Sequence, residues 1–82
     1  MIDVLYFAWV RERIGLPRER VETGATTVAE LIAELKRREE RYALAFSDLR
    51  AIRAAVDQTL VDLDAPITGA REVAFFPPMT GG

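Results

Sequence analysis

The sequence predicts a small two-layer α+β domain, in which one amphipathic helix crosses one face of a mixed sheet of four or five strands. Three observations support this prediction. Short segments rich in β-branched and aromatic residues stand near both ends of the chain, and a single apolar stripe with helical spacing lies between them. The chain has 82 residues, 50% of them hydrophobic, which suits one domain with one thin core.

An alternating pattern predicts the first strand over residues 2–10. Both sides of this segment are largely apolar, with Ile2, Val4, Tyr6 and Ala8 on one side and Asp3, Leu5, Phe7 and Trp9 on the other. Residues 11–14 are expected to form a charged turn or a short helical piece that Gly15 ends. A short polar strand over residues 18–22 is then expected to return antiparallel beside the first.

The main helix is predicted to begin after Thr27, because Thr27–Glu30 has the pattern of a capping box, in which the threonine and glutamate side chains satisfy each other's backbone amides. Four apolar residues follow at helical spacing: Val28, Leu31, Ile32 and Leu35. The basic run Lys36–Arg38 complements the negative end of the helix dipole.

The second half of the chain predicts a short helix or packed loop over residues 42–49 and a third strand over residues 52–56. A turn at Asp57–Thr59 is expected, with Asp57 hydrogen-bonded to its own backbone. A short partner strand over residues 60–63 and a final strand over residues 72–76 complete the sheet. This order of elements is that of the ubiquitin-like β-grasp fold, with a domain over residues 1–76 and a tail over residues 77–82.

One helix covers only one face of a sheet, yet the first and last strands carry bulky apolar residues on both faces. If Val4, Tyr6, Val73 and Phe75 face the helix, alternation turns Leu5, Phe7, Ala74 and Phe76 away from it. Leu60 is expected to join this second set. We interpret the set as a docking surface for a partner, with partial burial under loops as the alternative.

Composition excludes several kinds of function. The net charge is −2, so no basic excess is available for a nucleic acid, and no apolar run is long enough to span a bilayer. The sequence contains no cysteine and no histidine, and we expect neither a metal site nor a cofactor bound by this chain. The carboxylate pairs are interpreted as solvated surface groups. The lack of cysteine is compatible with the cytoplasm, where we expect the protein to act.

The last six residues carry the main candidate for chemistry. After the final strand come Pro77 and Pro78, which prevent further sheet pairing, and then Met79, Thr80, Gly81 and Gly82. Extended, this segment reaches about 20 Å, which is enough to enter a partner's cleft. Glycine has no Cβ to widen a chain that threads a tunnel. The carboxylate of Gly82 is therefore the predicted reactive group, activated by transfer of AMP from ATP.

Several segments together resemble the small, sulfur-carrier subunits of molybdopterin synthases. They are Phe7-Ala8, Arg11-Glu12, Thr27–Leu31, Ala55–Gln58 and, most specifically, Glu72–Pro78 with the terminal Gly81-Gly82. The resemblance runs from end to end. Two departures lie in turns, where Asp57 replaces a common asparagine and Ala70-Arg71 replaces a usual Gly-Asp.

The resemblance implies a cycle for the tail. A ubiquitin-activating-like adenylyltransferase, which uses ATP, adenylates Gly82, and a sulfurtransferase system converts it to a thiocarboxylate. Residues 77–81 then insert into the large synthase subunit, within a heterotetramer, and the sulfur passes to cyclic pyranopterin monophosphate during molybdenum cofactor synthesis. By the same resemblance, the partner interface contains Phe7, Arg11, Leu60 and Phe76.

Three alternatives remain open at the level of sequence. A terminal Gly-Gly also fits a sulfur carrier of the thiamine pathway, or a ubiquitin-like modifier conjugated to lysines. A plain β-grasp binding module with an incidental tail is the third.

Overall fold

The computed structural model describes residues 1–78. Within that range, five strands form a single mixed sheet with the order β2-β1-β5-β3-β4. The elements along the chain are β1 (Ile2–Tyr6), α1 (Ala8–Ile14), β2 (Arg18–Val21), α2 (Val28–Arg38), α3 (Glu40–Ala45), the 3₁₀ turn η1 (Leu49–Ala51), β3 (Arg53–Val56), β4 (Thr59–Val61) and β5 (Glu72–Phe76).

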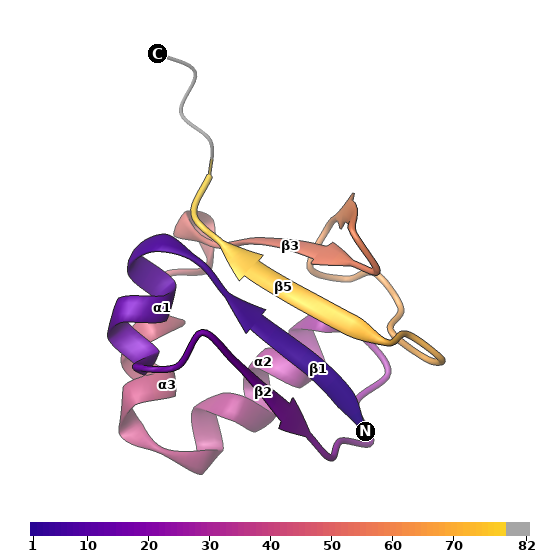
Figure 1. The fold of residues 1–82 in the computed structure, drawn as a ribbon, viewed down its shortest axis with the longest axis horizontal. Helices are drawn as coiled ribbons and strands as arrows, with labels where there is room; N and C mark the ends of the chain where they lie inside the picture. Colours follow the sequence, from indigo (N-terminus) through magenta and orange to yellow (C-terminus); the bar gives the residue numbers. More distant parts are fainter. Residues whose placement is uncertain (79–82) are drawn as a thin grey trace.

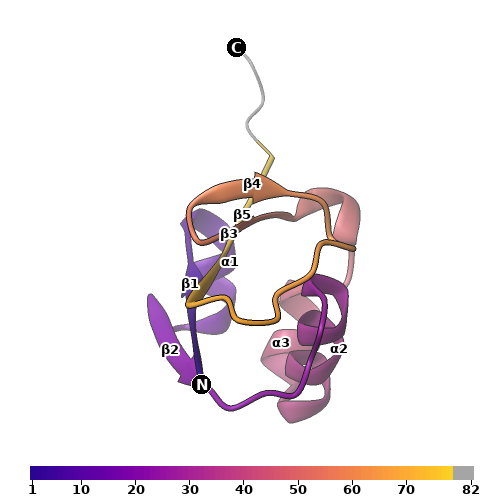
Figure 2. The same cartoon turned by 90° about the vertical axis from the view of Figure 1, so that its right-hand side faces the viewer.

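The sheet is built around the parallel pair β1 and β5, with the other neighbours antiparallel. Figure 1 looks onto one face of the sheet, with α2 and α3 behind it, and Figure 2 shows from the side that these helices cover only the far face. We call the covered face the inner face and the other the outer face. The α+β class and the β-grasp arrangement predicted from the sequence are confirmed.

The core lies between the inner face and the helices. Val4, Tyr6, Val73 and Phe75 face it and are at most 1% exposed, as the alternation predicted. The Phe75 ring stacks on the Tyr6 ring at 6.3 Å and meets the Phe46 ring edge-on at 5.0 Å. From α2 the predicted apolar stripe joins this core: Val28, Leu31, Ile32 and Leu35.

The prediction of a first strand reaching Val10 was wrong. β1 ends at Tyr6, and Ala8–Ile14 is the helix α1, which includes the segment expected to be a turn or helical piece. Val10 and Ile14, one helical turn apart, are both buried. The alternation of apolar residues in the sequence extends beyond Tyr6, but the strand itself does not. Gly15 ends α1 in a left-handed conformation at φ 89°, as expected of a helix C-terminus.

Two details of predicted turns differ from the structure. Thr27 caps α2 by accepting from the Glu30 amide, but the Glu30 carboxylate accepts from the amide and hydroxyl of Thr26, not from Thr27. Asp57 does not bond its own backbone. Its Oδ1 accepts from the amides of Arg71 and Glu72, at 2.9 and 3.0 Å, because the β3–β4 turn lies beside the start of β5.

Candidate docking surface at the root of the tail

A continuous row of apolar residues crosses the outer face. The strand registers pair Leu5 with Ala74, Ala74 with Ala55, and Ala55 with Leu60. Leu60 is 67% exposed on the edge strand β4, whereas Ala74 is only 8% exposed because it lies between neighbouring strands. Leu60, but not Ala74, therefore presents a free apolar surface.

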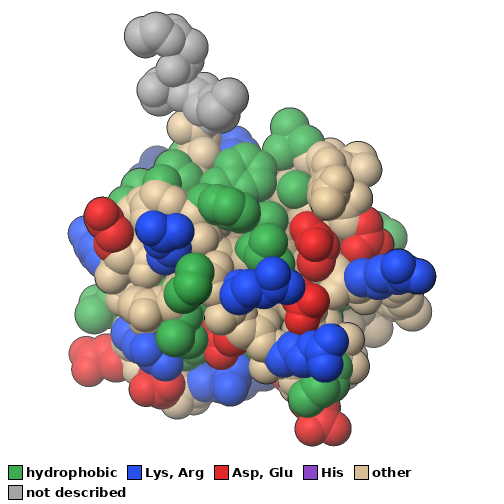
Figure 3. Space-filling view, in the orientation of Figure 1, with side chains coloured by type: hydrophobic (Ala, Val, Ile, Leu, Met, Phe, Trp, Pro, Cys, Tyr) green, Lys and Arg blue, Asp and Glu red, His purple; other side chains and the backbone are tan. Residues whose placement is uncertain are grey.

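Two aromatic residues extend this row toward the end at which β5 finishes. Phe7 continues the ladder past β1, since its amide donates to the Phe75 carbonyl at 3.0 Å, and this places it next to Phe76. Phe7 is 45% exposed and Phe76 is half-buried. We define the docking surface as Leu5, Phe7, Leu60 and Phe76. Figure 3 shows hydrophobic side chains gathered toward this end of the outer face.

The opposite end of the outer face is charged. Asp3 on β1 forms ion pairs with Arg18 and Arg20 of β2, each at 3.2 Å. Glu72, at the start of β5, is paired in register with Asp3. The outer face therefore changes from charged to apolar along the direction in which β5 runs, and its apolar end is the one from which Pro77 and Pro78 continue.

A local backbone feature fixes the position of Phe7. Phe7 is the extended N-cap residue of α1, and Ala8 follows at φ 54°, a conformation that residues with a Cβ seldom adopt. The sharp turn at Ala8 ends β1, which leaves the phenyl ring of Phe7 at the corner between strand and helix.

Arg11 lies on α1, one turn after Phe7, and its side chain is exposed. Its amide donates to the Phe7 carbonyl at 3.4 Å, so its backbone is tied to the same corner. Among residues 1–78, no carboxylate lies within ion-pairing distance of its guanidinium. Within residues 1–78, Arg11 is thus an unpaired cation one helical turn from Phe7, at the margin of the docking surface.

The structure brings Phe7, Leu60 and Phe76 onto one face, with Arg11 near them, but their role in binding a partner stays a prediction. Pro77 and Pro78 follow β5 and are half-buried. Met79, Thr80, Gly81 and Gly82 lie outside the described residues.

Sequence reasoning missed Arg53, which pairs across the strands with Phe76. Only the strand register reveals this neighbour, and no sequence signal reports it.

Sequence reasoning also missed a partly buried polar network on the inner side of β2. The hydroxyls of Tyr6 and Tyr42 both donate to Oε2 of Glu19, at 2.7 and 2.6 Å, and Arg38 lies 3.8 Å from Oε1. Burial, with the hydrogen bond to Glu19, raises the pKa of Tyr42 to about 12 and raises that of Tyr6 further. Each group has its partner, which favours a structural role that ties α3 to the sheet.

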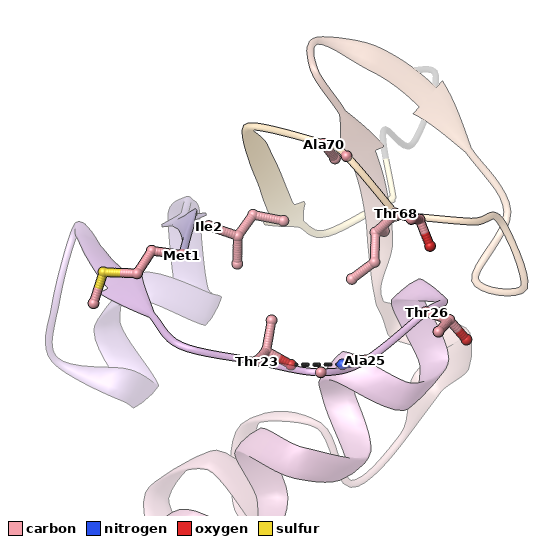
Figure 4. Close-up of a pocket in the computed structure, with 10 residues that line it drawn as sticks. Met1, Ile2, Thr23, Ala25, Thr26, Thr68 and Ala70 are labelled. Atoms are coloured by element: carbon pink, nitrogen blue, oxygen red, sulfur yellow. Dashed lines mark hydrogen bonds between the residues drawn. The ribbon is translucent and has the colours of Figure 1, made fainter.

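A shallow cleft of about 400 Å³ lies at the far end of the sheet, where β1 and β5 begin (Figure 4). Backbone, methyl and hydroxyl groups line it, from Met1, Ile2, residues 23–26 and residues 67–70. The Thr23 hydroxyl inside it already accepts from the Ala25 amide at 3.0 Å. None of its lining residues has an ionisable side chain, so the cleft offers no side-chain acid or base.

Two further searches covered residues 1–78 only. In that range no cluster of three or more histidine, cysteine, aspartate or glutamate side chains is arranged to hold a metal ion. Over the same residues, every helix is too short or too polar to cross a lipid bilayer.

Comparison with known proteins gives matches over nearly the whole chain. The model of the ThiS family matches residues 4–82. The molybdopterin synthase sulfur carrier subunit of Escherichia coli (strain K12) is 48% identical over 82 residues, which is 100% of both chains.

Two solved structures have similar folds. A putative molybdopterin converting factor, subunit 1, from Pyrococcus furiosus superposes with a TM-score of 0.70 at 27% identity, covering 95% of this chain and 97% of that one. SAMP1 from Haloferax volcanii superposes with a TM-score of 0.72 at 22% identity, covering 99% and 98% of the two chains, and this likeness concerns the fold alone.

Proposed function

The chain belongs to the ThiS family, and we propose that it is the sulfur-carrier subunit of a molybdopterin synthase and acts in molybdenum cofactor biosynthesis. The observation that carries this proposal is the 48% identity to a subunit of that name along the full length of both chains. Because the two chains align from end to end, Gly82 corresponds to the last residue of that relative. The fold supports the proposal by ending β5 at the apolar end of the outer face.

The reactive group in this proposal is the carboxylate of Gly82. One of its oxygens attacks the α-phosphate of ATP on an activating enzyme, which releases pyrophosphate and leaves an acyl-adenylate. Hydrosulfide from the sulfur source then attacks the acyl carbon and displaces AMP, which leaves a thiocarboxylate. That sulfur is transferred to cyclic pyranopterin monophosphate, and water restores the carboxylate of Gly82.

The described residues contribute delivery and recognition. β5 is hydrogen-bonded on both sides, to β1 and β3, so the root of the tail is held rigidly. Pro77 and Pro78 have no amide hydrogen to extend the sheet, and their restricted φ stiffens the exit of the chain. The docking surface beside them supplies apolar area for a partner whose active site receives residues 77–82.

The partners in the proposed cycle are the large synthase subunit, in a heterotetramer, a ubiquitin-activating-like adenylyltransferase and a sulfurtransferase system. The chain itself binds no cofactor in this cycle, and ATP is used by the activating enzyme. We expect the cycle in the cytoplasm, because ATP is supplied there.

Intact mass spectrometry tests the proposal. The full chain is incubated with the activating enzyme, ATP and a sulfur source, and the expected result is a mass gain equal to the replacement of one oxygen atom by sulfur. Persistent absence of this gain would overturn the proposal. Gly-Gly remnants on the lysines of other proteins would instead indicate a ubiquitin-like modifier.

A chain that lacks Gly82, and a chain with one residue added after it, are the matched controls. Both should fail to gain sulfur, because the carboxylate is then misplaced in the partner's active site. Their melting temperatures should equal that of the parent chain, since changes at a terminus beyond the last strand cost little stability.

A further inference from the structure

Arg53 lies directly beside the aromatic residue at the root of the tail. In the antiparallel register of β3 and β5, Arg53 is the partner of Phe76, so both side chains lie on the outer face. Arg53 is exposed, and the next residue of β3 on the same face, Ala55, belongs to the apolar row that ends in Leu60. A cation is thus built into the margin of the docking surface.

The guanidinium of Arg53 is held in place by the backbone. Its Nη1 donates to the carbonyls of Arg50, at 3.2 Å, and Ile52, at 3.0 Å. Its Nε and Nη2 have no hydrogen-bond partner among residues 1–78. An arginine that is fixed on one side and has free donors on the other is already ordered for a planar anion, so binding costs less conformational entropy.

The neighbouring charges differ from Arg53 in this respect. The Arg50 side chain donates to both oxygens of Asp48, at 3.1 and 3.4 Å. Asp62 borders the same hollow of about 270 Å³ as Arg53, yet no carboxylate lies within ion-pairing distance of Arg53 in the described part of the chain. Arg50 is therefore paired with Asp48, whereas Arg53 has no ion-pair partner among residues 1–78.

We propose that Arg53 is a specificity-determining residue of the docking surface, where it binds an aspartate or glutamate carboxylate of the large synthase subunit. The proposal rests on the proposed function. A carboxylate matches the fork of the guanidinium and its position at the rim of an apolar contact. The phosphates of ATP and of the pterin substrate fit less well, because they act at Gly82, at the end of a segment that can reach about 20 Å when extended.

Binding of the large subunit to the full-length chain, measured by titration calorimetry at low and moderate salt, tests this. We expect Arg53→Gln to weaken the affinity about tenfold at low salt and to reduce its salt dependence. Arg53→Lys should recover only part of the loss, because an ammonium lacks the fork geometry. Arg50→Gln is the matched control and should change the affinity by less than about twofold.

The outcomes separate this inference from the function on which it rests. If Arg53→Gln binds as well as the parent while Phe76→Ala does not, the Arg53 proposal is overturned and the docking surface stands. Equal losses for Arg53→Gln and Arg50→Gln would also overturn it, because net charge alone would then explain them. If the parent chain does not bind the large subunit, both proposals fail. The melting temperatures of the Arg53 and Arg50 variants should equal that of the parent.

Discussion

Phe75 and Phe76 are adjacent residues of the same type in the same strand, yet their surroundings differ completely. Phe75 is 0% exposed and packs against the rings of Tyr6 and Phe46. Phe76 points to the outer face, beside Phe7 and Arg53, and remains half-buried. A step of one residue along β5 therefore separates Phe75, which stabilises the fold, from Phe76, which is exposed enough to contact a partner.

The same division occurs on β1, where Tyr6 is 1% exposed and the next residue, Phe7, is 45% exposed. Because β1 and β5 are parallel neighbours, the two outward aromatic residues lie side by side, and so do the two inward ones. In the proposed function, stability and recognition therefore belong to opposite faces of the same two strands. Substitutions on one face should leave the property of the other face unchanged.

The largest effect is expected for Phe75→Ala. Removing a fully buried phenyl ring leaves a cavity between the sheet and α3, and should lower the free energy of unfolding by about 3–5 kcal/mol. Denaturant titration followed by circular dichroism measures this loss. A loss below about 1 kcal/mol would show that Phe75 is not a core residue.

Phe76→Ala is the matched change on the outer face. It should weaken binding of the large synthase subunit by about 2 kcal/mol or more, as expected of a central aromatic anchor. The free energy of unfolding should fall by much less than for Phe75→Ala, because the ring is only half-buried. Unchanged affinity together with a strongly lowered melting temperature would instead assign Phe76 to the core.

The sequence predicted the features of the two faces that depend on residues close together in the chain, and not those that depend on distant residues. The two faces of β5 were predictable because alternation is a local property of a strand, and Val73 and Phe75 are buried as expected. The start of α2 was predictable from Thr27 for the same reason. The end of β1 was not predictable. The helix α1 buries only Val10 and Ile14, and two apolar residues one helical turn apart do not distinguish a helix from a strand.

Contacts between distant segments could not be predicted. Glu19 has the pattern of an exposed residue in a polar strand, yet it accepts hydrogen bonds from tyrosines 13 and 23 residues away. Asp57 was expected to bond locally and instead holds the start of β5. Arg53 lies beside Phe76 only through the β3–β5 register. Each depends on which strands and helices become neighbours in space.

The Glu19 network predicts a medium effect that depends on pH. Both tyrosines have pKa values raised in the folded protein above the ordinary value of 10.0. The stabilisation is therefore complete below pH 10.0 and is lost as the pH rises toward about 12, through the pKa of Tyr42. Unfolding by denaturant at increasing pH should show this loss.

Tyr42→Phe is the control for this prediction. It removes one donor to Glu19 and should cost about 1 kcal/mol at neutral pH. It should also reduce, without abolishing, the decrease in stability above pH 10.0, since Tyr6 still titrates. A variant whose stability falls with pH as steeply as that of the parent would show that Tyr42 does not contribute.

The smallest effect is expected at the β3–β4 turn, which belongs to neither face. Asp57 and Gln58 both have positive φ, 48° and 72°, as a two-residue hairpin turn of this hand requires. Glycine adopts such a conformation without steric cost, so Gln58→Gly should raise the free energy of unfolding by about 0.5 kcal/mol.

Asp57→Asn retains a side-chain oxygen that accepts from the amides of Arg71 and Glu72, so its free energy of unfolding should be nearly unchanged. Asp57→Ala loses this oxygen and should be destabilising. Because the turn lies at the far end of β3 from Arg53, all three variants should bind the large subunit as the parent does. A loss of affinity in any of them would show that the docking surface extends over the whole outer face.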